Sequence, residues 1–249
     1  MPSHLTSLGF LVTTEKDFRH YVFAASEFGQ KLESPNGSYT VWALGNGIEL
    51  WVQTNLHRRI LGMKPHFSGH SRMKVGLSRR IVRSDQSILD GALYAWADPQ
   101  DEKAESGTYP FVFDLPDYDL HNDVAIPGSA TIQLAAFAHE LQGFESEGAY
   151  ETVQGSDVRF ATESFIPSGL FTPGSRGGRE QPVAQAIFSG RVLVTQILTN
   201  PVTSQRFYWA RVHTLGGEVD VVADPQVVQG KVVKGGIIRG TFWLSGRLV

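Results

Sequence analysis

Apolar and polar residues alternate most regularly in the last quarter of the chain. Residues 187–199, 206–215, 218–223 and 237–248 each show the two-residue period of a half-buried strand, with turn-forming residues between them. Glycines occur inside the longest of these runs, where they permit the sharp bends that a small closed barrel requires. The pattern predicts a self-contained antiparallel barrel over residues 185–249.

Helical spacing of apolar residues is clearest near the start of the chain. Thr14 followed by Asp17 is close to a capping box, and apolar residues then recur three or four apart as far as Leu32. The run 9–13 just before Thr14 has the composition of a short strand. The pattern predicts a strand followed by a helix.

Two further β runs follow, 39–44 and 48–52, joined by the hairpin signal Gly45-Asn46-Gly47. Together with the preceding strand and helix they form a β-α-β-β unit. We assign this unit to residues 1–66.

The region 67–165 is mostly β in pattern, ending in a short polar helix near 145–154. Residues 129–144 fit both a helix and a strand. A weak internal duplication favours the strand. Three pairs of segments carry the similarity: 92–98 with 207–213, 109–117 with 217–225, and 130–141 with 236–248.

Glycine and proline are concentrated between residues 166 and 182, which predicts a linker or long loop over 166–184. The expected fold class is therefore α+β and mostly antiparallel β. It consists of the N-terminal unit (1–66), a β-rich region that could be a first barrel (67–165), the linker, and the C-terminal barrel (185–249).

The C-terminal strand layout resembles the oligonucleotide/oligosaccharide-binding (OB) fold, without a signature motif. The chain as a whole also resembles uncharacterised bacterial families, which implies a fold and no particular chemistry.

Composition narrows the class of protein further. The 249 residues are 41% hydrophobic and 19% charged, as in ordinary globular proteins. There is no cysteine, which excludes disulfides, thiolate zinc sites and a cysteine nucleophile. The first residues lack the pattern of a signal peptide, and no run is long and apolar enough for a membrane span. We expect a cytoplasmic protein without a membrane partner.

Charge is strongly segregated although the net charge is only −3. Residues 57–83 carry eight Lys/Arg and no acid, whereas residues 84–151 carry fourteen Asp/Glu against the single base Lys103. Either the two runs neutralise one another on neighbouring strands, or the basic run forms a patch for phosphates or anionic sugars.

Aromatic and basic residues interleave on two of the C-terminal strands. In single-stranded nucleic-acid binding, bases stack on aromatic side chains while arginines contact phosphates. The alternative is that the aromatic residues fill the barrel core. The predicted ligand-binding residues are Arg206, Tyr208, Trp209, Arg211, Arg239 and Trp243.

The opening unit ends in Gly47-Ile48-Glu49-Leu50-Trp51 and resembles half of a glyoxalase/bleomycin-resistance module. In that superfamily a glutamate on such a strand is a metal ligand, which the resemblance would assign to Glu49. No second such unit supplies the other ligands.

Other ionisable clusters lack the spacing of a metal site. His66 and His70 are four residues apart, but a glycine separates them and a run of bases surrounds them. The acids in 114–123, together with His139-Glu140, could bind Ca²⁺ or Mg²⁺ but lack EF-hand spacing. We predict no metal and no other cofactor, and we identify no catalytic residue.

The sequence therefore favours a non-enzymatic binding or interaction module, for a polyanion such as single-stranded nucleic acid. The alternative is a small-molecule or metal-dependent enzyme that uses the N-terminal unit. A homodimer formed through exposed strand edges is a further alternative.

Overall fold

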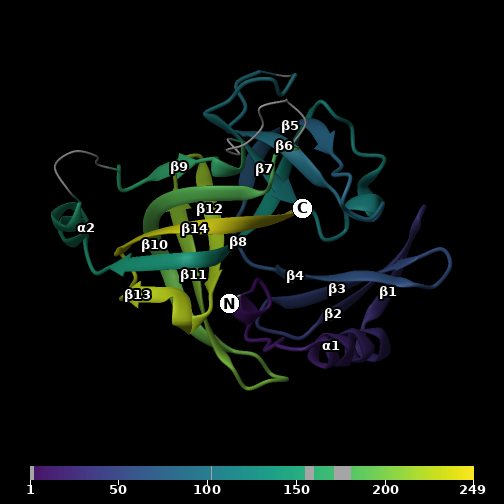
Figure 1. The fold of residues 1–249 in the computed structure, drawn as a ribbon. Coiled ribbons are helices and arrows are strands. Elements are labelled where there is room, and N and C mark those ends of the chain that lie inside the picture. Colours follow the sequence, from purple (N-terminus) through teal and green to yellow (C-terminus); the bar gives the residue numbers. More distant parts are fainter. Residues whose placement is uncertain (1–2, 102, 155–159, 171–180) are drawn as a thin grey trace.

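The computed structural model describes residues 3–101, 103–154, 160–170 and 181–249. It is mostly antiparallel β, in two sheets, with two α-helices in the described part of the chain. In Figure 1 the first sheet and helix α1 lie at the lower right, and the second sheet occupies the left and top of the molecule. No helix in the described residues is long and apolar enough to cross a membrane.

The first sheet has four antiparallel strands in sequence order and carries α1 on one face. Tyr21, Val22 and Ala25 of the helix share a core with Leu50 and Val52 of the sheet. The elements are α1 (Glu15–Phe28), β1 (Gln30–Ser34), β2 (Gly37–Ala43), β3 (Ile48–Asn55) and β4 (Ile60–Phe67).

The start of α1 confirms the capping prediction. The Thr14 hydroxyl accepts a hydrogen bond from the backbone N–H of Asp17, and the Asp17 carboxylate accepts one from the N–H of Thr14. The helix ends at Phe28 instead of Leu32. Gly29 is extended there, where a Cβ atom would lie 2.5 Å from the carbonyl oxygen of Ala25.

The predicted strand at residues 9–13 is wrong. Its backbone meets a turn instead of a neighbouring strand, because Asn200 donates to the Leu8 carbonyl at 2.8 Å and Thr203 donates to the Gly9 carbonyl at 2.6 Å. The first unit therefore has the order α-β-β-β-β and is not the predicted β-α-β-β.

The second sheet contains the remaining ten strands. They are β5 (Met73–Ile81), β6 (Ala92–Ala97), β7 (Tyr109–Asp114), β8 (Gly128–Phe144), β9 (Ser164–Ile166), β10 (Gln185–Thr199), β11 (Arg206–Thr214), β12 (Gly217–Ala223), β13 (Val228–Gly230) and β14 (Ile237–Leu248). The short helix α2 (Glu147–Val153) follows β8, and 3₁₀ turns occur at Thr6–Leu8, Tyr118–His121, Ser168–Leu170 and Pro225–Val227.

The four C-terminal strands predicted from the sequence are confirmed as β10, β11, β12 and β14. They do not close on their own. β12 pairs in parallel with β8, and β8 pairs with β14, so the ring β8-β12-β11-β10-β14 needs a strand from the middle of the chain. The prediction that residues 185–249 form a self-contained barrel is corrected in this respect.

A second ring uses the same two long strands. Its order is β8-β5-β6-β7-β14, and its parallel link joins β7 to β14 at Asp114 and Ser245. The set β5 to β8 therefore has the same order and sense of pairing as the set β10, β11, β12 and β14. This correspondence is what an internal duplication would produce. In it β8 matches β14, and residues 128–144 are accordingly a strand and not a helix.

Aromatic side chains fill much of the interior of the second sheet; the rings of Phe188 and Phe242, for example, stack with centroids 4.0 Å apart. The predicted linker begins inside a strand, since Ile166 ends β9, which pairs with β10. Most of the linker, residues 171–180, lies outside the described part of the chain.

Candidate functional site

The six residues predicted to bind a ligand are divided between β11 and β14, on opposite sides of β10. Arg206 pairs across the sheet with Thr199 of β10, and Arg239 pairs with Ser189. These positions are ten residues apart along one strand, on the order of 30 Å. The structure does not bring the six residues into one binding face.

The two predicted tryptophans are core residues, each 8% exposed. The indole N–H of Trp209 donates to Asp220 at 2.9 Å, and that of Trp243 donates to Asp114 at 2.8 Å. A base could not stack on either ring without displacing the side chains that cover it. The prediction that these two tryptophans stack on a ligand is therefore corrected: both side chains are part of the core.

The covering side chains come from distant parts of the sequence. His4 stacks on Trp243 with ring centroids 4.1 Å apart, and Phe67 lies 6.1 Å from Trp209. Burial, and then the neighbouring His139, lower the pKa of His4 to about 4, so its ring is neutral at physiological pH. Strand alternation alone could not show these contacts.

The remaining predicted residues are more accessible. Arg206 is exposed, and Tyr208 is half-buried on the opposite face of β11 from Trp209. The Arg211 side chain lies 3.4 Å from the Glu218 carboxylate. Arg239 is half-buried and lines a cavity.

This cavity has a volume of about 310 Å³ and is open at the surface of the second sheet, across β13, β8, β14 and β10. Its lining is mainly polar, and we refer to it as the Arg239 cavity. The lining residues are Glu140, Leu141, Gln142, Ile187, Gln229, Arg239, Gly240 and Thr241.

Strand register brings the polar side chains of the Arg239 cavity together. Arg239 lies opposite Gln142, which in turn lies beside Gln229 on the parallel strand β13. The Thr241 hydroxyl donates to the Glu140 carboxylate at 2.7 Å. Gly240 lies between these positions, where a Cβ atom would be 2.4 Å from the Glu140 carbonyl oxygen, so the close approach of β8 and β14 requires glycine.

The guanidinium of Arg239 packs over an aromatic ring. It lies 4.1 Å from the ring centroid of Phe160. Within the described residues, no Asp or Glu oxygen lies within the 4.0 Å of an ion pair with Arg239. The planar fork of an arginine suits a bidentate contact with a carboxylate or phosphate group.

Sequence reasoning missed the partners of Arg239. Glu140 appeared only in a cluster considered for Ca²⁺ or Mg²⁺, and Gln142 and Gln229 were not singled out. The alternation of residues 130–141 contained the signal, because a strand there places Glu140 and Gln142 on one face.

Glu49, the residue assigned by the glyoxalase resemblance, lies between the two sheets. Burial raises its pKa, and the nearby Arg247 opposes that shift. One carboxylate oxygen accepts from the Trp51 indole at 2.9 Å, and the other lies 3.5 Å from Arg247. A tryptophan and a cation thus occupy the positions in which a metal would be expected.

His66 and His70 do not converge on one point. His66 is fully buried between the hydroxyl of Ser245 and the side chain of Gln133, each at 2.9 Å. Burial lowers the pKa of His66 to about 4. His70 lies instead beside Trp209, with ring centroids 6.1 Å apart.

Three of the acids of residues 114–123 are engaged in structural contacts. Asp114 pairs with Arg83 at 2.8 Å, Asp117 lies 3.1 Å from His121, and Asp119 accepts from the backbone of Asn36 at 2.9 Å. The described residues contain no group of three or more His, Asp or Glu side chains placed to hold a metal ion.

The basic run 57–83 is partly neutralised by the acidic run that follows it. Lys64 pairs with Asp90, and Arg83 pairs with Asp114. Arg80 donates to the carbonyl of His121. The remaining bases of the run are exposed: Arg58, Arg59, Arg72, Lys74 and Arg79.

No protein-family model matches the chain, and no curated protein matches it in sequence.

Proposed function

We propose that the protein is a binding protein that takes a small anionic, hydrogen-bonding molecule into the Arg239 cavity. The observation that carries this proposal is an arginine in a concave polar site, oriented by an aromatic ring, that pairs with no carboxylate of the described residues. Arginine recognises carboxylate and phosphate groups through its paired N–H donors.

The rest of the lining supports a ligand with several polar groups. Gln142 and Gln229 each offer a donor and an acceptor, and Thr241 offers a hydroxyl. Glu140 accepts hydrogen bonds, which favours a ligand that also carries a hydroxyl or amine. A site of about 310 Å³ suits a molecule of metabolite size.

The proposal is tested by titration calorimetry of the full chain with inorganic phosphate, small phosphorylated sugars and small di- and tricarboxylates. We expect at least one compound to bind. We expect Arg239→Met to weaken it roughly 10- to 100-fold, since a hydrogen bond to a charged group contributes about 1.5–3 kcal/mol. Methionine retains an apolar contact with Phe160.

Arg206→Met is the matched control, because it removes an exposed arginine from β11 at a distance from the cavity. Its affinity should equal that of the unmodified protein. Absence of binding for every compound, or equal affinities for the two variants, would refute the proposal.

The ligand could also be one unit of a polyanion such as single-stranded nucleic acid, with a single phosphate group bound by Arg239. For such an extended ligand, unlike the small molecules above, Arg206 would supply a further phosphate contact, and stacking would depend on Tyr208. A further element of the proposal is that the ring β8-β12-β11-β10-β14 is an OB-like barrel. Binding of a single-stranded oligonucleotide at about 50 mM salt that weakens as salt rises would support the polyanion.

A further inference from the structure

The hairpin that joins β3 to β4 has an exposed apolar tip. Leu56 is 70% exposed, Ile60 52% and Leu61 40%. Single exposed apolar residues are ordinary on a protein surface, but three within six residues of one turn form a cluster. We call residues 55–61 the hairpin tip.

The backbone of the hairpin tip is tightly organised. Asn55 donates to the carbonyl of Arg59 at 2.9 Å, and its side-chain oxygen accepts from the N–H groups of His57 and Arg59 at 3.0 Å. Arg58 has a φ of 60°, a left-handed conformation in which glycine or asparagine is usual. Several polar groups of the turn are thus satisfied internally, which lowers the cost of moving the turn out of water.

A β-bulge directs two consecutive aliphatic side chains into solvent. Ile60 pairs with Thr54 and Gly62 pairs with Gln53, which leaves Leu61 as the extra residue. In a regular strand one of two neighbours would face the sheet. The bulge instead leaves both Ile60 and Leu61 exposed.

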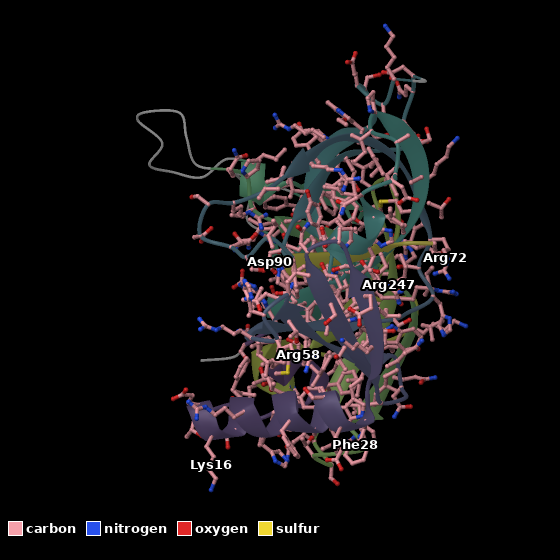
Figure 2. The ribbon with its side chains drawn as sticks, turned by 90° about the vertical axis from the view of Figure 1, so that its right-hand side faces the viewer. Lys16, Phe28, Arg58, Arg72, Asp90 and Arg247 are labelled. Atoms are coloured by element: carbon pink, nitrogen blue, oxygen red, sulfur yellow. The ribbon has the colours of Figure 1, made fainter. Side chains whose placement is uncertain are left out.

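The charge of the hairpin tip is positive. His57, Arg58 and Arg59 are all exposed, and neither arginine pairs with a carboxylate in the described part of the chain. The tip lies at the right-hand edge of the molecule in Figure 1, and Figure 2 shows that side with Arg58 labelled. The tip thus combines exposed aliphatic side chains with positive charge, the pairing that suits an anionic lipid surface.

We propose that the hairpin tip docks on an anionic membrane surface. Arg58 and Arg59 contact the lipid phosphates and acidic headgroups, while Leu56, Ile60 and Leu61 enter the boundary with the acyl chains. This inference is independent of the Arg239 cavity, and it differs from the sequence-based expectation of no membrane partner.

Vesicle co-sedimentation of the full chain tests the proposal. We expect binding to phosphatidylcholine vesicles containing about a third phosphatidylserine, little binding to pure phosphatidylcholine, and weakening as salt rises. The pair Arg58→Gln and Arg59→Gln should reduce the partition coefficient roughly tenfold or more, at about 1 kcal/mol per arginine. The pair Leu56→Ser and Ile60→Ser should also reduce it.

The matched control is the pair Arg72→Gln and Lys74→Gln, which removes two exposed bases, one just before β5 and one near its start (Arg72 is labelled in Figure 2). This control and Arg239→Met should bind vesicles like the unmodified protein. Equal loss in the tip and control pairs, or no binding to acidic vesicles, would overturn the proposal. Oligonucleotide binding lost only in the arginine pair would assign the tip to nucleic acid instead.

The tip pairs and the control pair should retain the thermal unfolding midpoint of the unmodified protein, because the side chains that they alter are exposed. A tip pair that lost vesicle binding together with its folded structure would be replaced by the single variants Arg59→Gln and Ile60→Ser. If these folded variants bound vesicles like the unmodified protein, the proposal would be wrong.

Discussion

At the scale of single residues, two buried aspartates explain why the predicted binding face is absent. Asp114 and Asp220 lie where parallel strands meet, opposite Ser245 and Ala135. Each accepts a hydrogen bond from a tryptophan indole, which satisfies the polar atom of an otherwise apolar ring. Such a partner lets a tryptophan enter the core, and a sequence pattern does not show where the partner lies.

His66 belongs to one of these networks. Its Nε2 donates to the Gln133 side-chain oxygen, and the Gln133 amide donates to Asp220 at 3.0 Å. The pKa of His66 is about 4 in the folded protein, below its ordinary value of 6.5. The unfolded chain therefore binds a proton between these two pH values that the folded chain does not, and stability is lost as the pH falls through that window.

We expect the free energy of unfolding to fall by about 1–2 kcal/mol on this account between about pH 7 and pH 5. Urea denaturation at the two pH values measures it. His66→Gln should be less stable at neutral pH but less sensitive to pH. Burial also lowers the pKa of His4 to about 4, so the stability of the variant should still depend on pH to some extent. An identical pH dependence in the variant and the unmodified protein would contradict the role of His66.

At the scale of elements, local chemistry was a reliable guide wherever a residue acts on its own neighbours in the chain. The capping residues of α1, the Gly45-Asn46-Gly47 hairpin and the four C-terminal strands all follow the sequence pattern. The strand predicted at residues 9–13 failed because a strand needs a partner, and there the partner is a turn.

The cap of α1 can be tested directly. Thr14→Ala removes the hydroxyl that accepts from the Asp17 N–H at 3.2 Å, and it should lower the free energy of unfolding by about 1 kcal/mol. Lys16→Ala, in the same exposed turn, should change it by less than about 0.5 kcal/mol. Urea denaturation that gave both variants the same stability would show that the cap contributes little.

At the scale of the whole molecule, β8 and β14 connect two rings of strands. Each ring closes only through both of these strands, so neither half of the second sheet is complete alone. Without β8, the four C-terminal strands would have two unpaired edges, one on β12 and one on β14.

This arrangement predicts that a fragment of residues 185–249 does not fold independently. Circular dichroism and amide chemical-shift dispersion should show an unfolded chain, with the full-length protein as the folded reference. A cooperative unfolding transition in the fragment would mean that the C-terminal strands can close without β8 after all.

The candidate site was predictable only in part. Arg239 stood out as a basic residue on an alternating strand, and it does line a cavity. Its neighbours Gln142 and Gln229 come from β8 and β13, and their place beside β14 depends on strand register. Register is set by tertiary packing, which the local pattern does not encode.

The sequence by itself determined the predominance of antiparallel strands, the capped helix and the extent of the C-terminal strands, because periodicity and capping act over a few residues. Only the tertiary structure decided which side chains reach the surface, since His4, Phe67 and Asp114 cover the tryptophans from distant parts of the chain. It also decided that β8 completes both rings. The physical reason is that burial and strand pairing are contacts between segments far apart in sequence, and hydrophobic pattern shows that a face is buried without showing what buries it.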